Sequence, residues 1–172
     1  QSVADQQFVA ALLQATGSQH KAFENASKRG WNAIYSGNYA EAAKRFNQAF
    51  LVAPERSAVY QGFAAIVQVR FNDLTFADEL FRIARKQPNP SRLLNADYGR
   101  FLLIAKRPRD AQPVLEQAVV DAPDFGDAWS NLAFARIQNG HREAACAAAD
   151  EAGKRNPSAN ASRAIALLKS QA

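Results

Sequence analysis

The sequence predicts an all-α protein whose helical hairpins follow one another as a right-handed α-α superhelix. The first observation that predicts this fold is a helix face on which small and large apolar residues recur at i, i+4 and i+7. The second is the period, because the leading alanines Ala42, Ala77, Ala111 and Ala145 stand 35, 34 and 34 residues apart. The third is the turn chemistry, as at Gly37, where positive φ costs glycine little. A period of about 34 residues is typical of helical-hairpin arrays.

Close packing explains why the leading residues are small. Each of these alanines falls where the two helices of a hairpin cross, so a larger side chain would force the helices apart. The first helix of each hairpin has a matching small residue. These matching residues are Gly30, Ala64, Gly99 and Ala133.

These features resemble the tetratricopeptide repeat (TPR) family from about Phe23 to Pro157. Trp129 and Leu132 match the tryptophan and leucine of the family pattern in the fourth repeat, and the second repeat has aromatic residues at both places. The second repeat is one residue longer than the others, and the alignment places the extra residue in the turn at 71–75.

The helices are expected at intervals set by turn and breaker residues. Gly17 ends the first, Pro108 suits the start of a later one, and Asn139-Gly140 forms the last turn inside a hairpin. The expected ranges are 3–16, 20–36, 39–52, 58–71, 75–86, 91–105, 108–121, 126–138, 142–154 and 159–172.

Three domains of unequal size follow from this order. Residues 1–19 form an N-terminal capping helix or half-repeat, residues 20–157 the four hairpins, and residues 158–172 a C-terminal capping helix. Ala4, Phe8 and Ala11 have the spacing of a second repeat helix, so both a remnant half-repeat and a purpose-made cap stay open for the first segment. The proline-containing segment 87–91 breaks the chain, but repeat spacing resumes after it, which favours one continuous array.

Composition narrows the function classes. Hydrophobic residues make up 48% of the chain and charged residues 22%, as in ordinary globular proteins, and no apolar run reaches the length of a transmembrane helix. The net charge of +5 is spread over helix surfaces, so it does not favour a nucleic-acid partner. The chain begins at Gln1 and contains no methionine, which indicates removal of a preceding segment.

The sequence contains no recognisable catalytic arrangement, metal site or cofactor motif. Phosphate-binding glycine loops, paired cysteines and nucleophile elbows are all missing. Cys146 is interpreted as a small apolar residue in a packed helix, and the two histidines as turn residues. The protein is therefore expected not to be an enzyme.

The resemblance places the candidate site on the first helices, because in TPR arrays these line a concave groove that binds partner peptides. The corresponding inward positions are Ser27, Trp31, Ile34, Tyr35, Gln61, Gln68, Arg100, Leu103, Asn131, Phe134 and Ile137. Aromatic residues such as Trp31 and Phe134 are not required by the packing pattern, which favours a binding role. The carboxylate clamp of chaperone-binding family members is absent, since its places are taken by Ser27, Trp31, Gly62, Leu93 and Ala96.

We therefore expect a protein-interaction scaffold that binds a peptide or helical segment of a partner in the groove. The alternative is a structural segment of a larger array in a bacterial envelope or secretion assembly, with contacts through its ends. Composition rich in alanine and arginine suggests a bacterial source, and the removed start favours a periplasmic or envelope location over the cytoplasm. Neither the partner nor the oligomeric state follows from the sequence.

Overall fold

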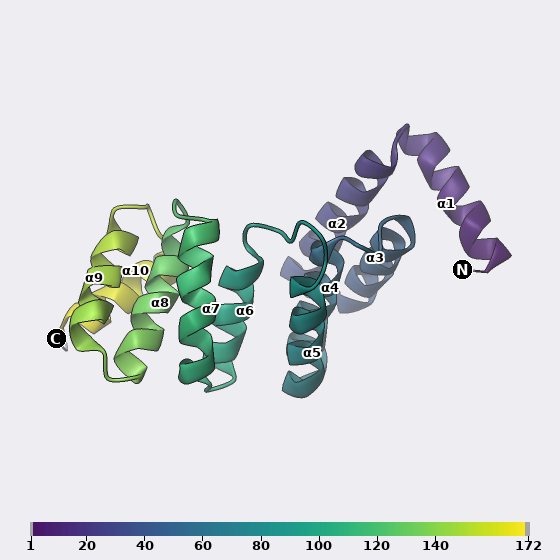
Figure 1. The fold of residues 1–172 in the computed structure, drawn as a ribbon. Helices are drawn as coiled ribbons and strands as arrows, with labels where there is room; N and C mark the ends of the chain where they lie inside the picture. The colour runs from purple at the N-terminus through teal and green to yellow at the C-terminus, as the bar shows by residue number, and fades with distance from the viewer. Residues whose placement is uncertain (1, 171–172) are drawn as a thin grey trace. The chain divides into compact units, whose positions relative to one another are not determined.

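The computed structural model describes residues 2–170 and shows an all-helical chain (Figure 1). Within that range there are ten α-helices and one π-helix, and no strand. The all-α fold expected from the repeat spacing is confirmed. The chain forms two compact units, Gln1–Ser91 and Arg92–Ala172. The division falls at the end of the 87–91 segment, across which a continuous array was expected.

The N-terminal unit holds one lone helix followed by two hairpins. Helices α2 and α3 form the first hairpin, and α4 and α5 form the second, with a short π-helix, η1, extending α4. Their bounds are α1 Val3–Thr16, α2 Gln19–Tyr35, α3 Tyr39–Val52, α4 Ser57–Ile66, η1 Val67–Phe71 and α5 Leu74–Arg85.

Phe46 of α3 is the centre of this unit. Its side chain is fully buried and packs against α2 and α4 at glycines. A Cβ atom on Gly30 would lie 2.8 Å from the ring, and one on Gly62 would lie 2.2 Å from it. Neighbouring Ala42 and Ala49 are also fully buried, so the predicted small-residue crossing is confirmed for this hairpin.

The extra residue of the second repeat lies in the π-helix η1, which continues the first helix of that repeat. This corrects the predicted position in the turn at 71–75. Residues Val67–Phe71 form a π-helix, whose wider turns take up one more residue than an α-helix of the same rise. The connection that follows has only Asn72 and Asp73, whereas Ser36–Asn38 in the first repeat has three residues. Asn72 has a left-handed φ of 51°, and the Asp73 carboxylate accepts from the backbone N–H of Phe76 at 2.9 Å, which begins α5 at once.

The C-terminal unit contains two more hairpins and a final helix. Helices α6 and α7 form one pair, α8 and α9 the other, and α10 packs against both helices of the last pair. Their bounds are α6 Leu94–Ile104, α7 Pro108–Asp121, α8 Gly126–Gln138, α9 Arg142–Gly153 and α10 Ala159–Ser170. Helix α6 begins three residues after the predicted 91, beyond the short turn at 92–93.

The small-residue crossings recur in this unit. A Cβ atom on Gly99 would lie 2.4 Å from the Leu115 side chain, and Ala111 and Ala145 are fully buried. Helix α10 covers the last hairpin with Ile165 and Leu168, both buried. The end of the last hairpin is thus shielded from water, as a repeat array requires.

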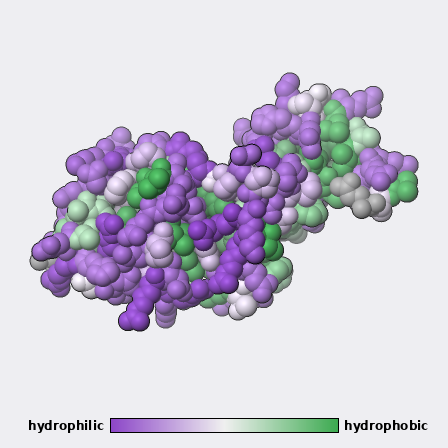
Figure 2. All heavy atoms as spheres, in the orientation of Figure 1, coloured by the Kyte–Doolittle hydropathy of each residue, from purple (hydrophilic) through white to green (hydrophobic). Residues whose placement is uncertain are grey.

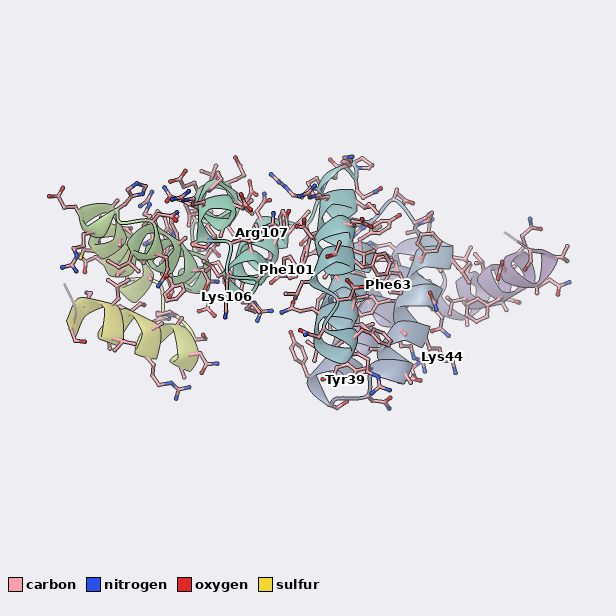
Figure 3. The ribbon with its side chains drawn as sticks, turned by 90° about the horizontal axis from the view of Figure 1, so that it is seen from below. Tyr39, Lys44, Phe63, Phe101, Lys106 and Arg107 are labelled. Carbon is pink, nitrogen blue, oxygen red and sulfur yellow. The ribbon has the colours of Figure 1, made fainter. Side chains whose placement is uncertain are left out.

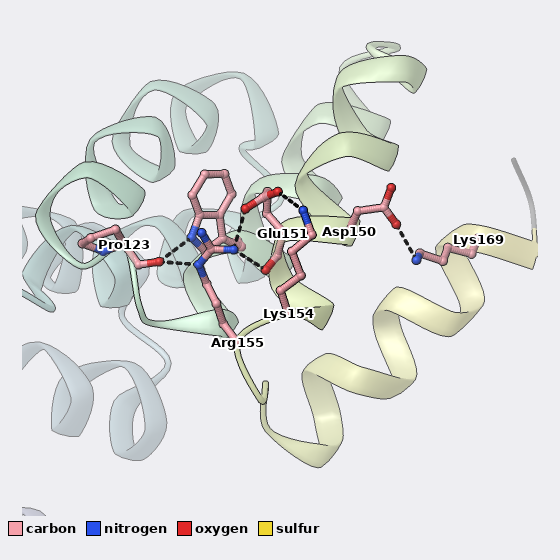
Figure 4. A network of polar contacts seen from close by, with 7 residues as sticks. Pro123, Asp150, Glu151, Lys154, Arg155 and Lys169 are labelled. Atoms are coloured by element: carbon pink, nitrogen blue, oxygen red, sulfur yellow. Dashed lines mark hydrogen bonds and ion pairs between the residues drawn. The ribbon is translucent and has the colours of Figure 1, made fainter.

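In two repeats, an aromatic side chain of the first helix donates a hydrogen bond to the carbonyl of the proline that precedes the helix. In α8 the indole Nε1 of Trp129 donates to the carbonyl of Pro123 at 3.0 Å, and in α4 the hydroxyl of Tyr60 donates to the carbonyl of Pro54 at 2.9 Å. The Arg155 guanidinium lies 4.8 Å from the Trp129 ring centre and donates to the same Pro123 carbonyl (Figure 4). The aromatic family position therefore ties each of these first helices to the preceding proline turn.

Candidate partner-binding clefts

A cleft of about 490 Å³ opens on the first helices of the N-terminal unit. Residues of α2 form one wall, the start of α4 forms another, and the 89–91 segment closes one side. We call it the Trp31 cleft. Its lining residues are Phe23, Glu24, Ser27, Lys28, Trp31, Arg56, Ser57, Ala58, Asn89 and Ser91.

Trp31 has two roles in this cleft. One edge of its ring packs against the buried Phe46 ring in a T-shaped contact, with centroids 5.5 Å apart. On its outer side it stacks with Tyr35 at 6.4 Å, and Tyr35 is 81% exposed. The core therefore fixes the position of Trp31, while part of its ring remains open to a ligand.

The polar groups of the Trp31 cleft differ in whether they already have a partner in the protein. Ser27 is buried, yet its hydroxyl oxygen has no hydrogen-bond partner within residues 2–170. Arg56 is occupied, since it pairs with Glu24 at 3.4 Å and lies over the Phe23 ring at 4.6 Å. Lys28 is exposed and forms no ion pair with any carboxylate in the described part of the chain. The cleft thus offers one hydroxyl and one ammonium group beside an aromatic wall.

The other predicted residues of this unit differ in exposure. Ile34 is half-buried and packs beside the Phe46 cluster, and Gln68 is half-buried in the π-helix. Gln61 is only 4% exposed and has interactions inside the chain. The structure therefore brings Ser27 and Trp31 together in one cleft, with Tyr35 stacked beside them, and places Gln61 in the interior.

In the C-terminal unit the predicted residues lie on α6 and α8, which pack against each other. Arg100 and Phe134 are exposed, Phe134 to 43%. Leu103, Asn131 and Ile137 are half-buried. The first helices of this unit thus present an exposed aromatic ring and a guanidinium group, as the sequence predicts.

A second cleft, of about 450 Å³, lies at the other end of the N-terminal hairpins. It is formed by the α2–α3 turn with Tyr39 and by Ile66, Arg70 and Phe71, which sit at or in the π-helix. Figure 3 marks Tyr39 at the start of α3, near the end of this unit's helices. None of these residues was predicted as a site, and the only sequence signal was the extra residue of the second repeat.

The two carboxyl groups with a lowered pKa, those of Asp5 and Glu151, form hydrogen bonds with nearby residues of the chain. Hydrogen bonds from the backbone and hydroxyl of Ser2 lower the pKa of Asp5, which caps α1. Hydrogen bonds from Lys154 and Arg155 lower the pKa of Glu151 (Figure 4). Among residues 2–170 no three histidine, cysteine or acidic side chains gather in a manner suited to a metal ion. In that same range no helix has both the length and the apolar character needed to cross a membrane.

Comparison with solved structures identifies the fold. PilF of Pseudomonas aeruginosa superposes with a TM-score of 0.78 at 20% identity, over 89% of this chain and 70% of that one. A thermophilic TPR protein of Thermus thermophilus gives a TM-score of 0.69 at 16% identity, over 95% and 98% of the two chains. YrrB, described as a TPR protein with an unusual peptide-binding site, gives 0.64 at 16% identity, over 83% and 73%.

Sequence comparison adds one family match. No curated protein matches the chain, but residues 102–169 match a family model described as Tetratricopeptide repeat. The hairpins outside that range repeat the same buried small-residue crossings, with Ala42 and Ala77 fully buried. Residues 102–169 thus match the tetratricopeptide repeat family, and the fold of the described residues is that of solved TPR proteins.

Proposed function

We propose that this protein is a non-enzymatic scaffold whose first helices bind a peptide or helical segment of a partner protein. The Trp31 cleft carries the proposal, because it combines an aromatic wall with the Ser27 hydroxyl and the Lys28 ammonium group, for which residues 2–170 provide no hydrogen-bond or ion-pair partner. Clefts that bind ligands are mainly apolar and contain a few well-placed polar groups. The peptide-binding site attributed to YrrB, a protein of the same fold, supports this type of function.

The cleft favours a segment of mixed character. An aromatic or aliphatic side chain would pack on the open side of Trp31, a carboxylate would pair with Lys28, and a backbone N–H would donate to the Ser27 hydroxyl. Because the Ser27 hydroxyl oxygen has no hydrogen-bond partner within residues 2–170, a ligand donor that reaches it would satisfy a group that is left unbonded without the ligand. A purely acidic segment does not suit the cleft, because Arg56 is already paired with Glu24.

The C-terminal unit supplies a second contact surface through Phe134 and Arg100. Aromatic residues and arginine contribute most of the binding energy where their contacts with the partner are desolvated. Both side chains are exposed on the first helices of this unit. We propose that they contact a further part of the same partner.

A titration of the partner against alanine variants tests this proposal. The partner is first isolated with the full chain as bait and identified by its loss with a Trp31→Ala, Phe134→Ala double variant. Each single variant at Trp31, Tyr35, Arg100 and Phe134 is then titrated. Truncation of an anchor should weaken binding by about 2 kcal/mol, roughly 30-fold, with the fold unchanged.

Phe76→Ala serves as the matched control, since Phe76 is an aromatic residue that is 47% exposed on a second helix, α5. Its affinity should equal that of the unmodified protein. Equal affinities for all four first-helix variants would reject the groove and favour the alternative, a structural segment of a larger envelope array with contacts through its ends. The exposed apolar face of α1 is the observation that favours this alternative.

A further inference from the structure

The first helix of the second repeat continues two residues further than the first helices of the other repeats. In the other three repeats this helix ends five residues after the small residue at the helix crossing. These ends are Tyr35, Ile104 and Gln138. In the second repeat the crossing residue is Ala64, and the π-helix η1 carries the helical structure on to Phe71. Arg70 and Phe71 therefore have no helical counterpart in the other first helices, and short π-helices often occur at functional sites.

These two residues line the cleft of about 450 Å³ beside the α2–α3 turn, which we call the π-helix cleft. The first repeat contributes residues 37–40 and Ala43 to the lining, and the second contributes Ile66, Arg70 and Phe71. Hydrophobic residues reach the surface of the N-terminal unit at several places (Figure 2), and the Phe71 side chain is 68% exposed. The volume of the cleft is within the range of about 300–1,000 Å³ that is typical of ligand sites.

Three hydrogen-bond donors line the π-helix cleft without a partner in residues 2–170. The Arg70 guanidinium forms no ion pair or hydrogen bond there. The Asn38 Oδ1 atom accepts from the backbone N–H of Glu41 at 3.1 Å, which leaves both Nδ2 hydrogens to donate elsewhere. Tyr39 is half-buried and packs beside the Phe46 cluster, and its hydroxyl has no hydrogen bond in that range. The cleft therefore offers donors, one of them charged, beside an apolar surface.

No aspartate or glutamate among the described residues lines the π-helix cleft. The two acidic residues next to it in the sequence are engaged, since Glu41 pairs with Arg45 at 2.6 Å and Asp73 caps the start of α5. A carboxylate from outside would therefore meet a guanidinium group for which no acid of the cleft competes. Arginine and carboxylate groups form paired, charge-assisted hydrogen bonds, which are stronger than neutral ones.

We propose that the π-helix cleft is a second binding site, which takes a partner segment with an aspartate or glutamate directly beside a large apolar side chain. The carboxylate pairs with Arg70 and accepts from the Tyr39 hydroxyl, and the apolar side chain packs on Phe71. Arg70 is the one charged residue that lines the cleft in the described part of the chain. A single cation suits one carboxylate, whereas nucleic acids need several phosphate contacts and phosphorylated residues are bound by clusters of arginine.

The π-helix cleft and the Trp31 cleft share no lining residue. Their arginines also differ, because Arg56 in the Trp31 cleft is paired with Glu24, whereas Arg70 has no such partner in residues 2–170. The inference therefore does not depend on the proposed groove function, and variants of one cleft serve as controls for the other.

The probes are two hexapeptides with blocked ends, Gly-Ser-Asp-Phe-Ser-Gly and Gly-Ser-Phe-Asp-Ser-Gly. Each is titrated into the isotope-labelled full chain, and the backbone amide signals are followed by NMR. We expect at least one peptide to bind saturably with a Kd below about 1 mM and to shift the signals of residues 37–43 and 66–71. Asparagine in place of the aspartate should weaken binding about tenfold.

Variants of the cleft identify the contacts. Arg70→Gln should weaken the aspartate peptide about tenfold and leave the asparagine peptide unchanged, so that the two peptides then bind alike. Phe71→Ala should weaken both peptides. The melting temperatures should stay close to that of the unmodified chain, because both side chains are exposed.

Two matched controls lie outside the cleft. Lys21→Gln removes the same charge from an exposed lysine in the first turn of α2, and Phe8→Ala removes a partly exposed ring from α1. Both chains should bind the peptides as the unmodified chain does, and so should Trp31→Ala.

Charge reversal gives an independent readout. A peptide with lysine in place of the aspartate should bind the Arg70→Glu chain more tightly than it binds the unmodified chain. A purely structural role of Arg70 would not produce this result.

Absence of saturable binding by both aspartate peptides would overturn the proposal, as would equal affinities for the aspartate and asparagine peptides. Binding that Trp31→Ala abolishes and Arg70→Gln leaves unchanged would overturn it too, because the peptide would then lie in the Trp31 cleft. Dimerisation of the chain that Arg70→Gln abolishes would also overturn it, since a second copy would then be the occupant.

Discussion

Gly62 of α4 lies directly against the ring of Phe46 in α3: a Cβ atom at position 62 would approach Cε1 to 2.2 Å. The ring is held on the opposite side by Gly30 of α2. One phenylalanine therefore joins two successive repeats, and the two glycines set how closely the three helices approach.

Replacement of Gly62 by alanine should destabilise the N-terminal unit. The added methyl group must displace a fully buried ring, and overpacking of this kind costs about 1–3 kcal/mol. Urea unfolding followed by circular dichroism measures the change. Gly153→Ala is the control, because nothing lies within 4 Å of that position and the change should be neutral or slightly stabilising. Similar midpoints for the two variants would show that the contact with Phe46 relaxes without cost.

Phe46→Ala should destabilise the protein far more than Phe8→Ala. They occupy the same place in the repeat pattern, but Phe46 is fully buried and Phe8 is 38% exposed. Truncation of Phe46 should cost about 3–5 kcal/mol, and truncation of Phe8 about 0.5 kcal/mol or less. The measurement is the free energy of unfolding of each variant without any partner. A large loss for Phe8→Ala would mean that α1 is packed against this face in solution.

The ion pairs of Glu151 should make the C-terminal unit more stable at neutral pH than in acid. Hydrogen bonds from Lys154 and then Arg155 lower the pKa of this carboxyl in the folded protein. Its contribution is therefore complete above the pKa of the unfolded chain and is lost as the pH falls through the lower folded value. Glu151→Gln should reduce the difference in urea midpoint between pH 7 and about pH 3.

Glu143→Gln serves as the control for that comparison, because Glu143 is an exposed glutamate of the same helix, α9. Its pH dependence should match that of the unmodified protein. If Glu151→Gln also leaves the difference unchanged, the hydrogen bonds from Lys154 and Arg155 do not persist in solution.

Deletion of Val69 should convert the π-helix to an α-helix. Val69 is 55% exposed within Val67–Phe71, and its removal restores the repeat length of the neighbouring hairpins. The helical signal should be retained and the melting temperature should change little. Deletion of Gln117 is the comparison, because it shifts the register of buried Ala118 and Val119 in α7 and should lower the melting temperature sharply. Equal losses for the two deletions would place the extra residue elsewhere.

The number and order of the helices follow from the sequence because their signals are local. The spacing around Ala42, the glycine turn at Gly37 and the breaker at Pro54 act over a few residues. Repetition of these signals makes the family recognisable at low identity. The Trp31 cleft could be predicted in part, since the resemblance to TPR arrays singled out Ser27 and Trp31 on the first helix as candidate binding residues.

Tertiary structure alone decided which of these side chains are accessible. Phe8 and Phe46 occur in the same pattern, yet one is exposed and the other buried, because burial depends on whether another helix lies opposite. Gln61 lies at a predicted inward position but is packed in the interior. The extra residue near Phe71 was visible in the spacing, but only the structure shows that it lies in a π-helix. A sequence pattern specifies the face of a helix, whereas exposure is set by contacts with residues far away in the chain.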